Sequence, residues 1–272
     1  MNTTSSAERS LRDGDPTAAL KQLQEQVRAK PADAKLRIFL FQLLAVLGQW
    51  ERARNQLDVA AGLDASALAM AQTYREAILC ELLRAQVFAG KKSPMVLGQP
   101  EPWLGLLIES VLQSGRGDDA AASKLRAEAF EQAPASAGTL EGEAFEWIAD
   151  ADSRLGPVLE AIINGRYYWV PFARLKRIVI EPPADLRDCV WMPAHLDLEN
   201  GGETVALIPT RYPGSESSED AQIVLSRKTQ WREVAESVFY GLGQRILATN
   251  AGEHGLMDVR EIRLGDGTPA EG

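Results

Sequence analysis

The chain has 272 residues, 45% of them hydrophobic and 25% charged, which is typical of a globular protein that can bury a core. Its net charge of -9 comes from residues 136–272, which hold 13 basic and 22 acidic side chains, because residues 1–135 hold 16 of each. Backbone phosphates attract basic surfaces, so neither half is predicted to bind nucleic acid. No apolar run approaches the ~20 residues of a membrane span. The polar N-terminus shows no secretory signal, so we expect a cytoplasmic protein with reduced cysteines.

The first half repeats at an interval of 34 residues: Gly14, Ala19 and Leu23 recur as Gly48, Ala53 and Leu57. Asp15 followed by Pro16 predicts a helix start, because aspartate is a good N-cap and proline fits the first helical position. Small residues at fixed places and glycine between paired helices are typical of tetratricopeptide-like units stacked into a solenoid. We therefore predict an all-α repeat domain of about seven helices over residues 1–135, with an irregular loop over residues 91–102.

Residues 133–142 are rich in proline, serine and glycine and are a predicted linker. Beyond them the hydrophobic period becomes that of strands, and Asn200-Gly201-Gly202 is a strong hairpin signal. Trp231, Val234, Ala235 and Val238 are spaced as on a helix, so we predict one helix over residues 230–241. No βαβ alternation occurs, which favours an α+β domain over residues 140–272 with a small antiparallel sheet and one or two helices. The predicted strands are 144–149, 158–163, 167–170, 177–180, 195–198, 204–209 and 257–264.

No catalytic constellation is visible. His195 and His254 are far apart, and neither has a metal-ligand partner at short spacing, so we predict neither a metal site nor a cofactor. Asp150 and Asp152 are interpreted as turn caps, with paired catalytic acids or metal ligands as the alternatives. Gly241-Leu242-Gly243 lacks the third glycine of a dinucleotide fingerprint. The segment 211–215 is interpreted as a Pro-Gly type II turn stapled by an aromatic, with a phosphate-binding loop as the alternative.

The stretch Phe145–Pro171 places five aromatics in 27 residues of a chain that is only 7% aromatic. It also has two turn signals, Leu155-Gly156-Pro157 and Asn164-Gly165, each followed by a β-prone run. Large amphipathic rings on a hairpin-rich sheet suit binding another chain better than breaking bonds.

Long motifs in the second half resemble the ImpE/TagJ family, also called SciE-type virulence proteins. These motifs are Phe145–Glu160, Asn164–Pro171, Leu186–Trp191, Pro209–Ser215 and Gly241–Arg245. The resemblance implies a cytoplasmic, non-enzymatic accessory protein of bacterial type VI secretion systems. It further implies binding to the small sheath subunit TssB and an association with sheath recycling by the AAA+ ATPase ClpV. It carries no catalytic residues over to this chain.

We therefore expect an adaptor that captures a segment of a sheath subunit. The residues from which we expect its binding surface to be drawn are Trp147, Tyr167, Tyr168, Trp169, Arg211, Tyr212 and Trp231. Alternate residues of a strand point to opposite faces, so about half of this set should belong to the core. Tyr167 and Trp169 share one face of their strand, and Tyr168 takes the other. Two rival hypotheses are a small-molecule-modifying enzyme built on the β domain and a structural scaffold that uses only the helical repeats.

Overall fold

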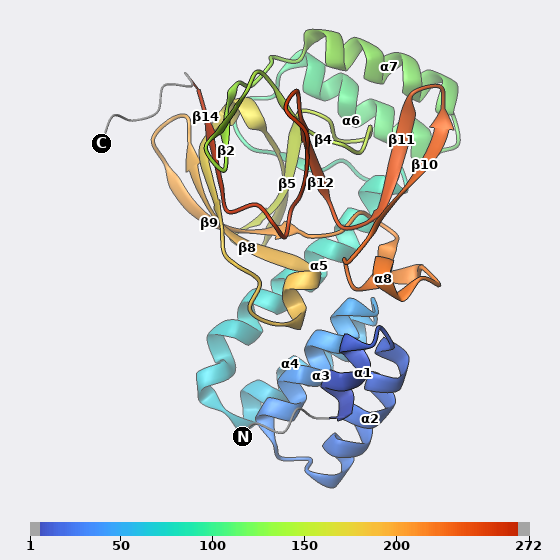
Figure 1. Ribbon diagram of the computed structural model, residues 1–272, viewed down its shortest axis with the longest axis vertical. Helices are drawn as coiled ribbons and strands as arrows, with labels where there is room; N and C mark the ends of the chain where they lie inside the picture. Colours follow the sequence, from blue (N-terminus) through green and yellow to red (C-terminus); the bar gives the residue numbers. More distant parts are fainter. Residues whose placement is uncertain (1–5, 266–272) are drawn as a thin grey trace.

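The computed structural model describes residues 6–265. A body of helices at the N-terminal end and a larger body built around a curled sheet are joined by one long helix (Figure 1). Helical and strand-rich regions therefore follow one another along the chain, as the change in hydrophobic period predicts.

The N-terminal body consists of α1 (Ser6–Arg12), α2 (Pro16–Ala29), α3 (Ala34–Val46) and α4 (Trp50–Leu63). The predicted start of α2 is confirmed, because the Asp15 carboxylate accepts a hydrogen bond from the Ala18 N–H at 2.8 Å. The four apolar residues of the 34-residue repeat, Ala19, Leu23, Ala53 and Leu57, are fully buried. The tetratricopeptide-like character of these helices stays a prediction.

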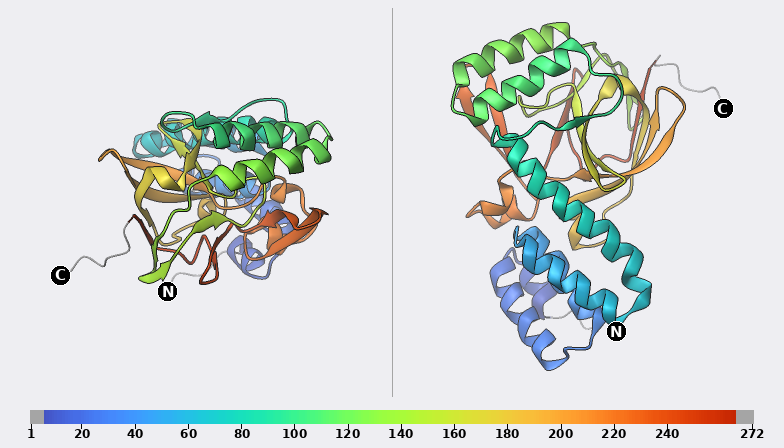
Figure 2. Two further views of the ribbon diagram at one scale, coloured as in Figure 1. Left: turned by 90° about the horizontal axis from the view of Figure 1, so that it is seen from above. Right: turned by 180° about the vertical axis from the view of Figure 1, so that it is seen from behind.

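The long helix α5 (Leu68–Phe88) follows η1 (Ala65–Ala67) and runs from the helical body onto the sheet, as the right-hand view of Figure 2 shows. Its Tyr74 ring lies 5.6 Å from Phe41 of α3 and 5.6 Å from Trp191 of the sheet, so α5 belongs to both bodies. Helices α6 (Pro102–Gly115) and α7 (Asp119–Gln132) lie beside the sheet, away from α1–α4 (Figure 1). The division of the chain near residue 135 stays a prediction.

The main sheet has nine strands, antiparallel except where β1 joins β6. In spatial order the strands are β1 (Met95–Val96), β6 (Arg166–Pro171), β5 (Val158–Ile163), β9 (Glu203–Pro209), β8 (Trp191–Leu198), β7 (Leu175–Ile180), β14 (Glu261–Leu264), β2 (Gly138–Leu140) and β3 (Glu143–Phe145). The hairpin predicted at Asn200-Gly201 is confirmed as the β8–β9 connection, where Gly201 has φ +84°.

Two smaller sheets complete the body. One contains β13 (Glu253–Gly255), β12 (Ile246–Thr249) and β4 (Ile148–Asp150), and the other is the hairpin of β10 (Thr229–Ala235) and β11 (Val238–Gly243). Short helices lie in the connections: η2 (Phe172–Arg174), η3 (Leu186–Cys189), η4 (Ser215–Ser217) and α8 (Ala221–Val224).

Several predicted elements differ from the structure. The predicted linker 133–142 contains β2, and the predicted irregular loop 91–102 contains β1, because both segments pair with strands of the main sheet. The helix predicted over residues 230–241 is wrong, because this segment forms the β10–β11 hairpin. Its reversal at Glu236-Ser237, where Ser237 has φ +58°, contains neither glycine nor proline, so no turn signal announces it. The strand predicted over residues 144–149 is broken between β3 and β4, and the one predicted over 257–264 begins only at Glu261.

The main sheet separates two apolar clusters. One lies between the sheet and the helices and includes Leu57, Ile78, Tyr167, Trp169 and Trp191. The other lies on the opposite face, inside the curl of the sheet, and includes Leu159, Val170, Ile178 and Ile208. Because β6 contributes Trp169 to the first cluster and Val170 to the second, the sheet is buried on both faces here.

Within the described residues, no helix is both long enough and apolar enough to span a bilayer. The same part of the chain holds no group of three or more His, Cys, Asp or Glu side chains placed to bind a metal ion.

Candidate functional site

The structure divides the seven predicted binding residues between interior and surface. Four are buried: Tyr167, Trp169, Arg211 and Tyr212. Trp147 is 40% exposed, and Tyr168 and Trp231 are partly buried. A side chain without accessible surface cannot contact a partner in this conformation. Trp147, Tyr168 and Trp231 therefore remain as candidate surface contacts.

Tyr167, one of the buried members of this set, contacts Glu160, a carboxylate with no accessible surface in the middle of β5. Arg84 of α5 binds it with two parallel hydrogen bonds, from Nε at 2.6 Å and from Nη2 at 2.8 Å. The Tyr167 hydroxyl also donates to Glu160 and accepts a hydrogen bond from Trp169 Nε1 at 2.8 Å. The two rings therefore support a carboxylate that ties α5 to the sheet.

A second arginine extends this network toward the smaller sheets. Arg245, also without accessible surface, donates from its guanidinium to both Glu160 and Asp150, and from Nε to the Pro209 carbonyl at 2.9 Å. The Tyr212 hydroxyl donates to Asp150 at 3.0 Å. We name the set Arg84, Asp150, Glu160 and Arg245 the buried charge network.

Electrostatics follow from this geometry. Burial alone would raise the pKa of Glu160, but Arg84 and Arg245 outweigh it and lower that pKa to about 2. At Asp150 burial has the larger effect: it outweighs the attraction of Arg245 and raises the pKa of the carboxyl to about 6. At neutral pH the network thus holds two cations and two anions, a balance that permits burial of all four.

Arg211 binds backbone instead of a carboxylate. Its Nη1 donates at 2.7 Å to the carbonyls of Val46 and Val224, and its Nη2 donates to Ala45 at 3.2 Å. These carbonyls lie at the C-terminal ends of α3 and α8, where the helix dipole favours a cation. Burial lowers the pKa of this guanidinium. Arg211 therefore joins the helical body to the sheet body.

Two local interpretations from the sequence are confirmed. The turn at Tyr212–Ser215 has Gly214 at φ +88° and a 3.3 Å hydrogen bond from the Ser215 N–H to the Tyr212 carbonyl, as a type II turn requires. Asp152 caps its turn by accepting from the Arg154 N–H at 2.9 Å. The cap interpretation is incomplete for Asp150, which accepts from the Asp152 N–H but also belongs to the buried charge network.

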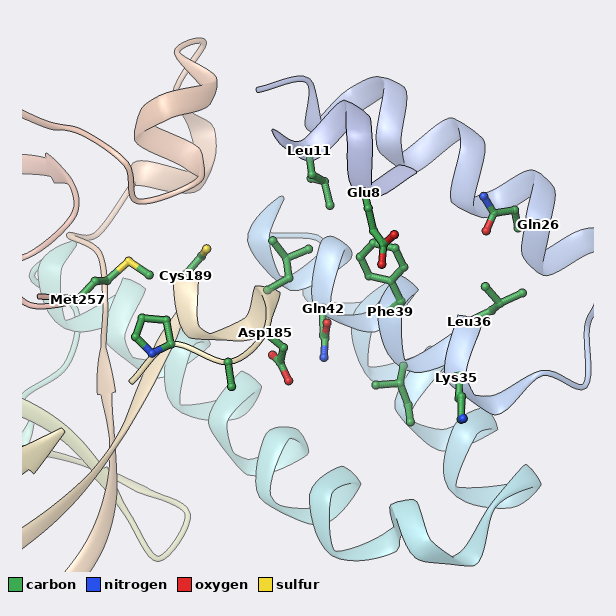
Figure 3. Close-up of a pocket in the computed structure, with 14 residues that line it drawn as sticks. Glu8, Leu11, Gln26, Lys35, Leu36, Phe39, Gln42, Asp185, Cys189 and Met257 are labelled. Carbon is green, nitrogen blue, oxygen red and sulfur yellow. The ribbon is translucent and has the colours of Figure 1, made fainter. Parts of the chain in front are cut away.

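An open groove lies between the two bodies (Figure 3). It encloses about 760 Å³ and is lined mainly by apolar atoms. One wall comes from α1, α2 and α3, with Leu11, Leu36 and Phe39 turned into the groove, and the other comes from residues 183–189 together with Met257. Lys35 and Asp185 carry opposite charges on the two walls. This arrangement can hold an amphipathic segment.

The sequence prediction missed both Glu160 and the groove. Glu160 had a signal: it is the single charged residue in the otherwise apolar run Val158–Ile163. Arg84 gave a weaker one, as a basic residue on the buried face of α5. The groove had none, because its two walls are more than 130 residues apart in the chain.

Comparisons with known proteins agree with the motifs. The model of the family described as "ImpE protein" matches residues 142–263. The type VI secretion system accessory component TagJ of Pseudomonas aeruginosa strain PAO1 is 53% identical over 256 residues, covering 94% of this chain and 90% of that protein. The chain belongs to the ImpE family. A crystal structure of a protein from Vibrio parahaemolyticus has the same fold, with a TM-score of 0.87, 26% identity, and 96% and 98% of the two chains covered.

The residues matched by the ImpE model include most of the buried charge network but only one wall of the groove. Asp150, Glu160 and Arg245 of the buried charge network lie inside residues 142–263, as do Arg211 and Tyr212. The wall of the groove formed by α1–α3 lies outside it. In this ImpE protein, the matched region thus contains three of the four network residues and one wall of the groove, and helices before it form the other wall.

Proposed function

We propose that this protein is an accessory component of a bacterial type VI secretion system. In this proposal it acts in the cytoplasm as a non-enzymatic adaptor that holds a segment of the small sheath subunit TssB in the groove between α1–α3 and residues 183–189. The similarity to TagJ of Pseudomonas aeruginosa supports the secretion role. The groove is the observation that supports binding of a segment.

The groove suits a helix better than an extended peptide. A helical ligand lays an apolar stripe into an apolar trough, whereas an extended ligand needs a free strand edge to pair with. Leu36 and Phe39 are spaced i, i+3 on α3 and are half-buried, so they form a ridge that such a stripe can meet. Lys35 and Asp185 then offer one charge of each sign to the polar rim of the partner helix.

Binding to purified TssB, measured by calorimetry, tests this proposal. We expect Leu36→Asp and Phe39→Asp each to weaken binding about 30-fold or more, because a charge placed at an apolar contact costs about 2 kcal/mol or more. Leu79→Asp is the matched control, since Leu79 is 52% exposed on α5 and lies outside the groove. Equal binding by all three variants would place the interface elsewhere.

Assistance to sheath assembly or to ClpV-linked recycling belongs to the same proposal. Adding ClpV to contracted sheaths with and without this protein measures the second role, with the Leu36→Asp variant as the control. If the wild-type protein speeds sheath disassembly and the Leu36→Asp variant does not, the recycling role is supported. If disassembly is equally fast with and without the protein, its role is restricted to assembly.

A further inference from the structure

Arg126 of α7 is an anomaly in the interior. Within residues 6–265, its Nε and Nη1 are the only buried side-chain nitrogen or oxygen atoms without a hydrogen-bond partner. The side chain is 4% exposed, and its one hydrogen bond runs from Nη2 to the Tyr240 hydroxyl at 3.3 Å. Arginine stays charged in proteins. A buried cation without a direct counter-charge is strongly unfavourable, so its place here needs an explanation.

A cavity of about 210 Å³ is lined by Tyr240 and lies between α6–α7 and the β10–β11 hairpin. Its wall contains Ser114, Arg154, Arg232 and Tyr240. The Tyr240 ring has the guanidinium carbon of Arg154 at 4.5 Å from its centroid and that of Arg126 at 5.9 Å. Arg154 and Arg232 therefore line one small polar space, and Arg126, which is not part of its wall, contacts the wall residue Tyr240. This cavity shares no lining residue with the groove.

The negative charges around the cavity do not balance these arginines. Asp152 is bound to Arg154 through Nε at 2.8 Å and Nη2 at 2.5 Å. Asp119 is the acidic residue in the cavity wall, and its carboxylate accepts a hydrogen bond from Ser114 Oγ at 2.9 Å. When Arg126 next to the wall is counted, three guanidinium groups outnumber these two carboxylates, which leaves a positive potential around the cavity.

A chain of hydrogen bonds links Arg126 to the cavity wall. Its Nη2 donates to the Tyr240 hydroxyl, which is 2.8 Å from Ser114 Oγ. Since the Ser114 hydroxyl donates its hydrogen bond to Asp119, the Tyr240 hydroxyl donates to Ser114. Each hydroxyl can turn toward another acceptor. An anion in the cavity can therefore receive a hydrogen bond from the wall as well as from Arg232.

We propose that this cavity is a binding site for a small oxyanion, a carboxylate or a phosphate group. In this site Arg232 and the hydroxyls of Ser114 and Tyr240 contact the anion. Arg126 lies outside the wall and adds its positive charge next to Tyr240, whose hydroxyl it contacts. The same chemistry comes from a free inorganic anion or from a small organic acid, and the test separates the two.

Thermal unfolding of the full chain is the test, with sodium phosphate or sodium acetate against sodium chloride at equal ionic strength. For a dissociation constant of about 1 mM, we expect 10 mM of the preferred anion to raise the melting temperature by about 3 °C. A response to phosphate alone assigns a phosphate group, and a response to acetate assigns a carboxylate. No response to either overturns the proposal and leaves ordered water as the partner of Arg126.

Three variants and one control variant locate the effect. Arg126→Met should abolish the response to the anion, whereas Arg116→Met, an exposed arginine at the end of α6, should keep it. Arg232 is exposed on β10, so the Arg232→Ala variant should fold normally and bind the anion about fivefold more weakly. Asp119→Asn removes the acidic group of the wall and should strengthen binding about threefold. An anion response that survives both Arg126→Met and Arg232→Ala contradicts the assigned site.

Discussion

The buried charge network and the groove differ in which side chains they bury and which they expose. In the network, four ionised side chains are sealed beneath α5, and each is held by partners on other elements. In the groove, apolar side chains of α3 and the polar Lys35 face open space. The network residues are thus out of reach of any partner, although three of the four lie in the region with the strongest motifs. The helical wall of the groove carries none of these motifs and has to be found from the fold.

The largest effect should come from breaking the network at its centre. Glu160→Gln leaves Arg84 and Arg245 buried without their shared carboxylate, so we expect it to lower the free energy of unfolding by about 3–5 kcal/mol. Urea denaturation measures this. Glu261→Gln is the control, because Glu261 binds Arg177 and Arg263 at the surface, and its loss should cost less than about 1 kcal/mol. Similar losses in the two variants would show that the sealed network contributes no special stability.

The next effect is a pH dependence carried by the same residue. Glu160 has a pKa of about 2 when folded, against an ordinary value of 4.5. The unfolded chain therefore binds its proton first, and the stability from Glu160, about 3 kcal/mol, is present above pH 4.5 and lost as the pH falls toward 2. Unfolding free energies measured from pH 5 to pH 3 should decrease more steeply for the wild type than for Glu160→Gln. Parallel curves would contradict the low pKa.

A smaller effect separates the two faces of β6. Tyr167→Phe removes a hydroxyl that donates to Glu160 and accepts from Trp169, and should cost about 1–3 kcal/mol. Tyr168→Phe is the control on the opposite face, where the ring is partly exposed, and should change stability by less than about 0.5 kcal/mol. If the Tyr168 variant is the more destabilised, the assignment of the faces is wrong. Thermal and urea unfolding give the comparison directly.

The smallest effect on stability should come from Trp147→Ala, because Trp147 is 40% exposed in the bend between β3 and β4. This variant decides between the groove and the aromatic surface as the binding site. We expect unchanged affinity for TssB if the segment binds in the groove. A loss of about 2 kcal/mol or more would instead assign the interface to the exposed aromatics.

The sequence predicted those features whose determining residues are adjacent in the chain. The start of α2 follows from Asp15 and Pro16, which are adjacent, and the β8–β9 hairpin follows from Asn200-Gly201. The β10–β11 hairpin was missed because Trp231, Val234, Ala235 and Val238 match a helical period by chance. In the structure a register shift between Glu233 and Ala235 disturbs the alternation that would have indicated strands.

Non-local features gave no comparable signal. Arg84 and Glu160 are separated by 76 residues, and only the fold makes them partners. The aromatic candidates show the same limit, since alternation predicts that Tyr167 and Tyr168 face opposite sides without indicating which side is covered. Helix α5 covers the Tyr167 side, and this packing could not be read from the strand itself.

The contacts of Arg211 also affect the rate at which a ligand segment can associate with the groove. This side chain fixes the last carbonyls of α3, the same helix that presents Leu36 and Phe39 to the groove. The α3 wall is therefore held in position before any ligand arrives. Binding to such a surface needs little ordering of the receptor, so its association rate should be limited by diffusion and by the folding of the incoming segment. A segment already helical in isolation should then associate faster than a disordered segment of the same composition.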